Sequence, residues 1–317
     1  MGLRASIIIP TFNRRPLLMA TLSSLAHQTV PPDRYEVVVG IDGSSDDTVE
    51  SLRASQFPFA LIWVWQENRG TAAAVNHAAA IATNDVLIFL GDDQRASAAL
   101  VATHLDAQAR HGDVLVQGYY PNAPECRRSG ASLVYARSVQ GLPDVFRAGG
   151  ARRWHLWGAN FSLRRSTWQR LGGYDESFGR MEDTDLGIRI AKLGIPSLFE
   201  PEALSYHLHS VTYEGFRRYS FNEGRALVRL ARKHALPLSV FSGASIESPV
   251  ERGLRIGWRH APRLMDLVGR GLTLCLRAAD GLAFQRAQVA AARLVRRVYK
   301  VGGIATNPGR WELHGGR

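Results

Sequence analysis

Residues 86–93 read Val86-Leu87-Ile88-Phe89-Leu90-Gly91-Asp92-Asp93, an apolar run followed at once by a glycine and two acids. A short apolar run of this length predicts a buried β-strand, so both carboxylates are expected in the loop that leaves the strand. Carboxylates in such a loop can hold Mg²⁺ or Mn²⁺, with water and substrate phosphates as the remaining ligands. By itself the pair is more typical of a turn or a helix N-cap, so its meaning depends on the rest of the chain.

Three more apolar runs on the N-terminal side also end in polar residues. Residues 6–9 lead into Pro10-Thr11-Phe12-Asn13-Arg14, residues 36–41 into Asp42-Gly43-Ser44-Ser45-Asp46-Asp47-Thr48, and residues 61–65 into Glu67-Asn68-Arg69-Gly70. Helical patterns separate the runs, and strands that alternate with helices predict a parallel sheet. Ligands of open α/β sheets bind beyond the carboxyl ends of the strands. We therefore expect Thr11, Asp42, Arg69 and the Asp92–Asp93 pair to converge at one edge.

Acidic residues also gather in the second half of the chain. Residues 157–164 read as a strand that leads into a helix around 166–171, and Glu182-Asp183-Thr184-Asp185 opens a further helix that Gly194 ends. Acids in the first turn of a helix offset its dipole and cap free amides, which is the simpler interpretation of these carboxylates.

Taken together, these motifs resemble the inverting glycosyltransferases of family 2, which have the GT-A fold. The resemblance runs from Ser6 to about His209. It is carried by residues 10–14, 42–48, 68–70, 91–93, 158–162, 172–176 and 182–186. Many relatives have three consecutive acids at the metal loop, and here Gly91 stands in place of the first. The resemblance implies an α/β fold with a Rossmann-like, mostly parallel sheet flanked by helices.

The resemblance also implies roles for the donor and metal site. Thr11 and Asp42 would face the base and ribose of a nucleotide-diphosphate sugar, Arg69 the base or diphosphate, and Asp92 the ribose. Asp93 would bind Mn²⁺ or Mg²⁺. A histidine would complete the metal ligands; His207 is favoured, but His209 lies two residues on and can share its face of a strand.

The same comparison makes Asp183 the general base that takes a proton from the acceptor hydroxyl, which then attacks the anomeric carbon. Glu182 is the neighbouring alternative and would more naturally bind acceptor hydroxyls. The implied function is metal-dependent inverting glycosyl transfer in cell-surface glycan or glycolipid synthesis, with a glycan, a lipid-linked molecule or another hydroxyl compound as acceptor. Asp42 and Arg69 favour uridine or thymidine diphosphate sugars, and guanosine donors stay open.

Composition suggests where the catalytic domain ends. Residues 119–153 lose periodicity and gain prolines and glycines, as in a long loop, and Tyr119, Tyr120 and Trp154 are candidates for an acceptor pocket or for core packing. Residues 237–250 have the composition of a linker. We therefore predict a catalytic domain over 1–236, a linker over 237–250 and a basic helical C-terminal region over 251–317.

Charge is concentrated in that last region. Residues 251–317 hold 13 Arg and Lys against 4 Asp and Glu, which is most of the net charge of +11. Arginines interleaved with apolar residues predict basic amphipathic helices, which bind anionic membrane surfaces or pack as solvated helices on the catalytic domain; both interpretations stay open. No nucleic-acid partner is expected, since no known reader motif accompanies the charge.

The remaining features concern location and other function classes. Cys126 and Cys275 fit no metal spacing and are expected as reduced thiols, and neither a secretory signal nor a membrane-spanning run of ~20 residues is found. We expect a cytoplasmic protein, with peripheral binding to the inner face of the membrane as an open alternative.

The alternative functions are a non-catalytic nucleotide-sugar or membrane-surface binding protein, and a sugar-phosphate nucleotidyltransferase, which would need a Gly-rich loop where Pro10-Thr11-Phe12-Asn13 stands. A dinucleotide-dependent oxidoreductase would need a Gly-rich fingerprint that is missing.

Overall fold

The computed structural model describes residues 2–126, 128–147, 156–208, 211–242 and 248–306. Its internal contacts divide the chain into two compact units. The first unit comprises Met1–Arg127 and Tyr135–Ser210, and the second comprises Arg128–Val134 and Val211–Arg317.

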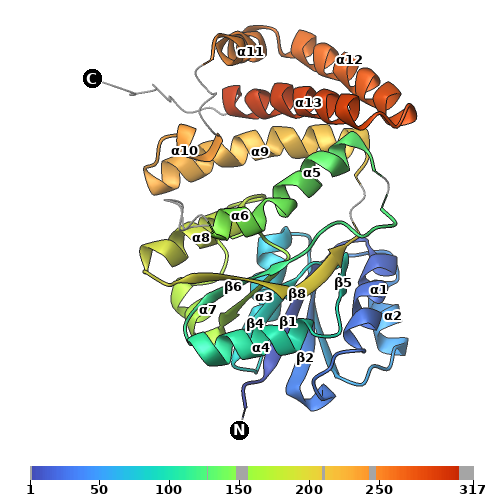
Figure 1. Cartoon of the computed structure of the whole chain (residues 1–317), viewed down its shortest axis with the longest axis vertical. Coiled ribbons are helices and arrows are strands. Elements are labelled where there is room, and N and C mark those ends of the chain that lie inside the picture. Colours follow the sequence, from blue (N-terminus) through green and yellow to red (C-terminus); the bar gives the residue numbers. More distant parts are fainter. Residues whose placement is uncertain (1, 127, 148–155, 209–210, 243–247, 307–317) are drawn as a thin grey trace. The chain divides into compact units, whose positions relative to one another are not determined.

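The first unit is built on a mixed sheet, and its described residues form eight strands in the order β3-β2-β1-β4-β7-β6-β8-β5 (Figure 1). The strands are β1 (Ala5–Thr11), β2 (Tyr35–Asp42), β3 (Ala60–Gln66), β4 (Val86–Leu90), β5 (Gln94–Ala96), β6 (Leu115–Tyr119), β7 (Asn160–Arg164) and β8 (Ser197–His207). Strands β1 to β4 run parallel, and β7 is antiparallel to both β4 and β6. The expected mostly parallel α/β sheet is confirmed.

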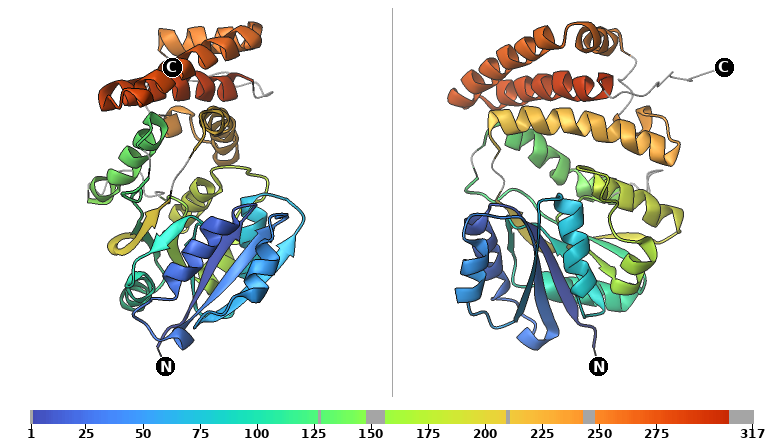
Figure 2. Two further views of the ribbon diagram at one scale, coloured as in Figure 1. Left: turned by 90° about the vertical axis from the view of Figure 1, so that its right-hand side faces the viewer. Right: turned by 180° about the vertical axis from the view of Figure 1, so that it is seen from behind.

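Helices cover both faces of this sheet, which explains why its central strands are apolar on both sides (Figure 2). One face packs against α1 (Arg15–Leu25), α2 (Thr48–Ala54) and α4 (Leu100–His111). The other packs against α3 (Thr71–Ile81), α7 (Arg165–Leu171) and α8 (Glu182–Lys192). Gly40 on β2 lets α3 approach closely, because a Cβ there would lie 2.3 Å from the carbonyl oxygen of Ala74.

The segment expected as a long irregular loop contains two helices, α5 (Gly130–Gln140) and α6 (Leu142–Arg147). The loop expectation was wrong for these residues, since a glycine at the start of a helix and Pro143 in a first turn are both compatible with helix. Tyr120 is buried with Val139 and Leu142, so it packs in a core cluster, with Tyr119 against the cluster's edge. Trp154 lies outside the described residues.

The second unit is helical, as expected of a basic C-terminal extension (Figure 1). Its elements are α9 (Tyr213–His234), α10 (Ser239–Ser242), α11 (Pro249–His260), α12 (Pro262–Gly281) and α13 (Gln285–Ala305). Helices α9 and α13 cross in close contact, because a Cβ at Gly303 would lie 1.9 Å from the carbonyl oxygen of Phe221. Glu223 of α9 also pairs with Arg296 of α13 at 2.8 Å.

This packing bears on the boundary expected from composition. Helix α9 packs with α13, and the longer segment of the second compact unit, Val211–Arg317, contains both. Prolines and serines mark a connection between helices, but they do not reveal which helices pack together. The division into a domain over 1–236, a linker over 237–250 and a region over 251–317 stays a prediction about independent folding. Among the described residues, no helix is both long and apolar enough to cross a bilayer.

Candidate active site

Two hydrogen bonds to backbone carbonyl oxygens hold the acidic loop, Gly91-Asp92-Asp93, that follows β4. The Thr21 hydroxyl donates to the carbonyl oxygen of Asp92 at 2.9 Å, and the Leu208 amide donates to the carbonyl oxygen of Asp93 at 2.8 Å. The two carboxylates are therefore directed by α1 on one side and by the end of β8 on the other. Both side chains are buried, with Asp92 and Asp93 only 4% and 8% exposed.

Arg14 bridges the two acids, a contact that the sequence analysis did not predict. Its Nη1 lies 2.7 Å from Oδ1 of Asp92, and its Nη2 lies 2.6 Å from Oδ2 of Asp93. Asp92 also accepts a bond of 2.8 Å from the Thr11 hydroxyl, and Asp93 lies 3.0 Å from Nε2 of His207. Arg14 closes the Pro10–Arg14 motif, so a cation at the end of β1 was visible, but its partners 78 and 79 residues away were not.

The two neighbouring carboxyl groups have opposite pKa shifts. Burial raises the pKa of Asp92 to about 7, and the charge of Asp93 adds to this while Arg14 opposes it. Burial would also raise the pKa of Asp93, but His207 and the Arg14 guanidinium together lower it well below its usual value. Asp93 is thus the member of the pair that stays ionised, as a metal ligand must.

The residues at this loop suit a hard divalent cation. Asp93 supplies an oxygen and His207 a nitrogen, which are ligands that Mn²⁺ accepts, and Mg²⁺ is commonly bound through one or two carboxylates plus phosphates and water. In the part of the chain that the structure describes, no group of three or more His, Cys, Asp or Glu side chains could hold a metal ion. Two protein ligands fit a cation that arrives with a diphosphate, and the Arg14 guanidinium already places one positive charge against the two acids. His209, the other histidine considered, lies outside the described residues.

Asp42 organises the loop after β3. Its Oδ1 accepts bonds of 2.8 Å from the Gln66 side chain and from the Arg69 amide, and its Oδ2 accepts one of 2.9 Å from the Gly70 amide. Asp42 and Arg69 are thus brought together, but through the backbone of Arg69. The Arg69 guanidinium instead pairs with Glu176 at 2.6 Å, and its side chain is 61% exposed.

Asp183 lies in the first turn of α8, as expected. Its Oδ2 accepts a bond of 2.7 Å from the Gly158 amide, and its Oδ1 accepts one of 2.6 Å from the Thr184 amide. Glycine at position 158 leaves room for this approach, because a Cβ there would make a tight contact of 3.1 Å with the Asp183 carboxylate. Two N–H groups and the start of α8 therefore hold the Asp183 carboxylate in place.

Strand register places Asp183 and the acidic loop at the same edge of the sheet. Strands β4 and β7 pair antiparallel with Leu90 opposite Asn160, so the loop that leaves β4 lies beside the loop that enters β7. A Cβ on Gly91 would lie 3.7 Å from the Cβ of Ala159, next to the Gly158 amide that Asp183 binds. The carboxyl end of the parallel strands therefore gathers all the described candidate residues.

Glu182 is half-buried at the start of α8, and its chemistry differs from that of Asp183. Burial raises the pKa of Glu182 to about 7 from an ordinary value of 4.5, and the neighbouring charge of Asp183 adds to the shift. A carboxyl group with this pKa carries its proton for much of the time near neutral pH. It can then donate a hydrogen bond.

This shift makes the stability of the protein depend on pH. The folded state holds a proton on Glu182 that the unfolded chain releases between pH 4.5 and about 7, so the free energy of unfolding falls as pH rises through this window. Glu182→Gln, which has no charge to bury, should be more stable than the native chain at pH 8 by about 1–3 kcal/mol and should differ little at pH 4.5. Urea unfolding at the two pH values measures the difference. The exposed Glu202→Gln on β8 is the control, and an equal gain for both variants at pH 8 would contradict the assignment.

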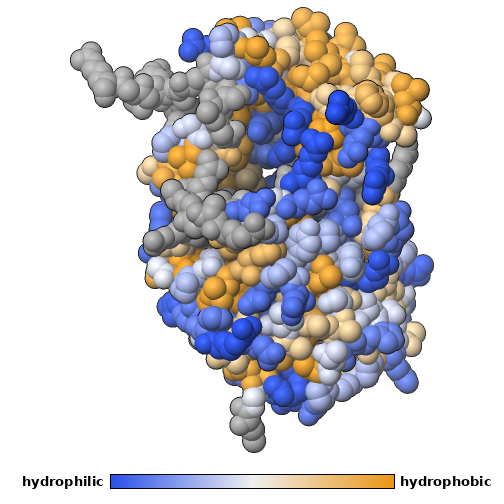
Figure 3. Space-filling model, in the orientation of Figure 1, coloured by the Kyte–Doolittle hydropathy of each residue, from blue (hydrophilic) through white to orange (hydrophobic). Residues whose placement is uncertain are grey.

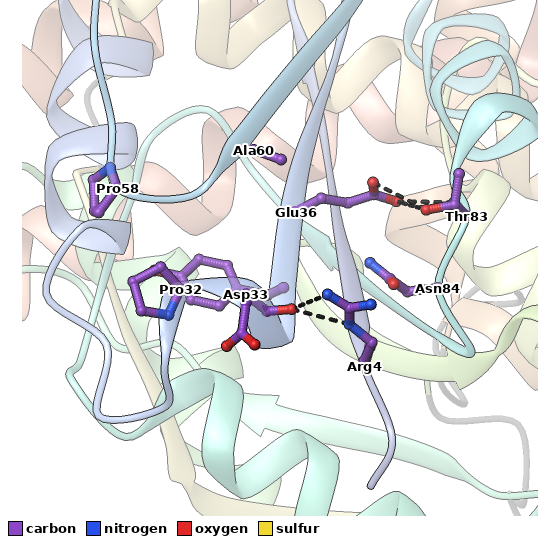
Figure 4. A pocket seen from close by; sticks show the side chains of 9 residues that line it. Arg4, Pro32, Asp33, Glu36, Pro58, Ala60, Thr83 and Asn84 are labelled. Carbon is purple, nitrogen blue, oxygen red and sulfur yellow. Dashed lines mark hydrogen bonds between the residues drawn. The ribbon is translucent and has the colours of Figure 1, made fainter. Parts of the chain in front are cut away.

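A cavity of about 500 Å³ lies at the other end of the strands (Figure 4). It is lined by Arg4, Pro32, Asp33, Tyr35, Glu36, Pro58, Ala60, Thr83 and Asn84. Glu36 points toward Thr83 and accepts bonds of 2.8 Å from its amide and 2.5 Å from the Ser6 hydroxyl. Because Ala5 pairs with Tyr35 at the start of both strands, this cavity is at the edge opposite the acidic loop. It is not part of the candidate active site.

Comparison with known proteins gives two family matches. The profile described as "Glycosyl transferase family 2" matches residues 6–171, which is more than half of the chain, and "Glycosyltransferase like family 2" matches residues 145–233. The first match includes the motifs at the ends of β1, β2, β3 and β4. The second includes Asp183 and His207.

Curated relatives agree with these matches. Validoxylamine A glucosyltransferase of Streptomyces hygroscopicus subsp. limoneus is 31% identical over 239 residues, which covers 66% of this chain and 52% of the relative. Succinoglycan biosynthesis protein ExoM of Rhizobium meliloti is 30% identical over 202 residues, covering 60% of this chain and 62% of that protein. The chain thus spans about half the length of the first of these relatives.

Solved structures share the fold at lower identity. Mannosyltransferase PcManGT from Pyrobaculum calidifontis, in complex with GDP-Man and Mn²⁺, has a TM-score of 0.59 at 20% identity and covers 93% of this chain and 87% of its own. S. aureus TarS 1-349 in complex with UDP-GlcNAc has a TM-score of 0.52 at 17% identity, covering 95% and 92%. With strand order, acidic loop and family profiles in agreement, the chain belongs to glycosyltransferase family 2 and has a GT-A-like fold.

Proposed function

We propose that this protein transfers a sugar from a nucleotide-diphosphate sugar to an acceptor hydroxyl, with inversion at the anomeric carbon and with Mn²⁺ or Mg²⁺ as cofactor. The observation that carries the proposal is the pair of buried acids, Asp92 and Asp93, at the same sheet edge as Asp183 in the first turn of α8. The Asp92–Asp93 pair suits the cation that accompanies a diphosphate. Asp183 suits an acceptor hydroxyl that must lose a proton.

Asp183 acts as the general base in this scheme. Its carboxylate takes the proton of the acceptor hydroxyl while that oxygen forms a bond to the anomeric carbon. The bond from the anomeric carbon to the diphosphate oxygen breaks on the opposite side, so the configuration inverts and the diphosphate leaves with the bonding electrons. Glu182, with its raised pKa, donates a hydrogen bond to an acceptor hydroxyl and helps to orient it.

The donor lies along the ends of β1, β2 and β4. Asp93 and His207 would hold the cation, which when bound offsets the negative charge that develops on the leaving diphosphate. Thr11 and Asp42 face the base and ribose, Asp92 accepts from the ribose, and Arg69 turns from Glu176 toward the base or diphosphate. Arg14, which pairs with Asp93, would compete with a bound cation for that carboxylate and could place its charge on the diphosphate instead.

Arg14 therefore competes with the metal in the donor-free protein. Arg14→Gln should raise the affinity for Mn²⁺ by about three- to tenfold, equivalent to about 0.7–1.4 kcal/mol of ion pairing removed. Titration of Mn²⁺ followed by electron paramagnetic resonance measures the affinity without donor or turnover. Arg15→Gln is the matched control, since Arg15 lies 3.8 Å from Asp47 and pairs away from the acidic loop. An Arg14→Gln protein that binds Mn²⁺ no more tightly than the native chain would remove Arg14 from this role.

The identity of donor and acceptor is the finer part of the proposal. Uridine and thymidine diphosphate sugars are favoured, because Asp42 and Arg69 can pair with the imide and carbonyl groups of a pyrimidine. TarS binds UDP-GlcNAc and PcManGT binds GDP-Man, so guanosine donors belong in any screen. We propose a glycan or lipid-linked acceptor in cell-surface glycan or glycolipid synthesis. A PGL/p-HBAD biosynthesis glycosyltransferase of Mycobacterium bovis, 32% identical over 122 residues, is among the relatives. We place the reaction in the cytoplasm, where nucleotide sugars are made.

A nucleotide-release screen tests the function. UDP, TDP and GDP sugars are incubated with the protein and a panel of hydroxyl acceptors, with Mn²⁺ or with EDTA, and released nucleotide is measured. We expect release from one nucleotide class that requires the metal, and proton NMR of the product should show an inverted anomeric configuration. No release from any donor, together with no nucleotide-sugar binding by calorimetry in Mn²⁺, would overturn the proposal in favour of a non-catalytic protein.

A further inference from the structure

The outer face of α12 carries an apolar stripe that the described residues of the second unit leave exposed. The stripe consists of Leu264, Leu267, Val268, Leu274 and Leu282, and the last residue caps the helix. Leu267 is 65% exposed, Leu274 is 63% exposed and Leu282 is 80% exposed. At 100° per residue these positions fall on one side of the helix. Figure 3 shows hydrophobic residues gathered over α12.

This stripe is separate from the core of the second unit. The buried face of α12 holds Gly269, Thr273, Leu276 and Ala279, and a Cβ at Gly269 would lie 2.5 Å from the Tyr299 ring of α13. Exposed large apolar side chains are also concentrated in the C-terminal helices. Nine of the thirteen strongly exposed large apolar side chains among the described residues lie between Val250 and Leu294. A soluble helix normally turns such residues inward, so a contiguous exposed set indicates a binding surface.

A row of arginines borders the stripe. Arg263, Arg270 and Arg277 recur every seven residues, so they lie along one side of α12. Asp266 offsets one charge of the row, because it pairs with Arg270 at 2.8 Å, whereas Asp280 accepts from the Gly130 amide and the Tyr213 hydroxyl. Residues 249–306 as a whole hold 11 Arg and Lys against 3 Asp and Glu. The surface beside the apolar stripe is therefore strongly positive.

We propose that the α12 stripe and its arginine row dock on an anionic membrane surface, with the helix axis parallel to the bilayer. Apolar side chains would enter the boundary between headgroups and acyl chains while the arginines meet the anionic headgroups. Charge selects this occupant over a second copy of the chain, since two copies would bring like-charged rows together. Docking on a membrane would bring the protein to a lipid-linked acceptor, and in this respect it rests on the proposed function. Membrane binding itself needs neither the donor nor sugar transfer, so an experiment can contradict the docking without contradicting the transfer, or the reverse.

Vesicle binding of the full chain tests the docking in the absence of nucleotide sugar and metal. We expect the protein to sediment with phosphatidylglycerol-containing vesicles and to bind pure phosphatidylcholine vesicles at least tenfold more weakly. The triple variant Leu264→Gln, Leu267→Gln and Leu274→Gln should lose at least tenfold of the partition coefficient for the anionic vesicles. The matched control replaces three exposed apolar residues of the first unit, Trp65, Ile81 and Leu193, by Gln and should bind as the native chain does.

Cys275 provides a second measurement that needs no change to the stripe. It is exposed on α12 between the stripe residues, and the half-buried Cys126 can be replaced by Ser to leave one labelling site. An environment-sensitive fluorophore on Cys275 should shift to the blue on anionic vesicles and stay unshifted on zwitterionic ones. No shift, equal binding to both vesicle types, or a native dimer that the triple variant abolishes would each overturn the proposal.

Discussion

Asp183→Asn is expected to reduce the rate of glycosyl transfer by about 10²- to 10⁴-fold, which is the range that a general base contributes. Asparagine has nearly the same shape and can keep the bond from the Gly158 amide through its side-chain oxygen. It cannot accept the proton of the acceptor hydroxyl. The change therefore removes the proton acceptor while leaving the first turn of α8 and the donor site in place.

Kinetics and binding distinguish this loss from misfolding. Single-turnover transfer measures the chemical step, and calorimetric binding of the nucleotide diphosphate with Mn²⁺ should be within about twofold of the native value. Asp106→Asn, a matched change on the exposed surface of α4, should leave both quantities unchanged. A fully active Asp183→Asn protein would move the base to another residue, and Glu182→Gln would then be the next variant to measure.

Asp93→Asn should weaken Mn²⁺-dependent binding of the nucleotide diphosphate by about 100-fold, equivalent to about 2.7 kcal/mol. The variant removes the one carboxylate of the pair whose pKa is lowered, and with it the charge that the cation needs. It also leaves the Arg14 guanidinium facing Asp92 alone, so Asp92 is expected to retain part of the site. Donor binding in EDTA should differ little between the variant and the native chain.

Calorimetry with the nucleotide diphosphate, in Mn²⁺ and in EDTA, measures both values. The Asp106→Asn protein is again the control, and thermal unfolding confirms that each variant is folded. If Asp93→Asn kept the native metal dependence, the cation could not be held by Asp93 with His207. In that case Asp92 would become the primary metal ligand, and its proposed contact with the ribose would be withdrawn.

Strands β1 to β4 and β7, and several helix starts, were readable from local patterns. The apolar run over 86–90 is β4 in the structure, and the acids after it lie at the carboxyl end of the sheet. Glu182 opens α8 as the cluster of acids predicted, because first-turn acids and helical spacing are local signals. Helices α5 and α6 were missed, since their prolines and glycines resemble loop composition. The packing of α9 with α13 was missed as well, because no local pattern names the partner of a helix.

The amino-acid sequence by itself determined the fold class, the family and the polar residues at the strand ends, because strand and helix periods differ and the motifs occur in a recognisable order. Only the tertiary structure decided that Arg14 bridges Asp92 and Asp93, that the Gly158 amide holds Asp183, and that the described residues leave one side of α12 exposed. These contacts depend on the register between distant strands and on which helix faces meet. Register and packing are set by the burial of many side chains together, and no single segment encodes them.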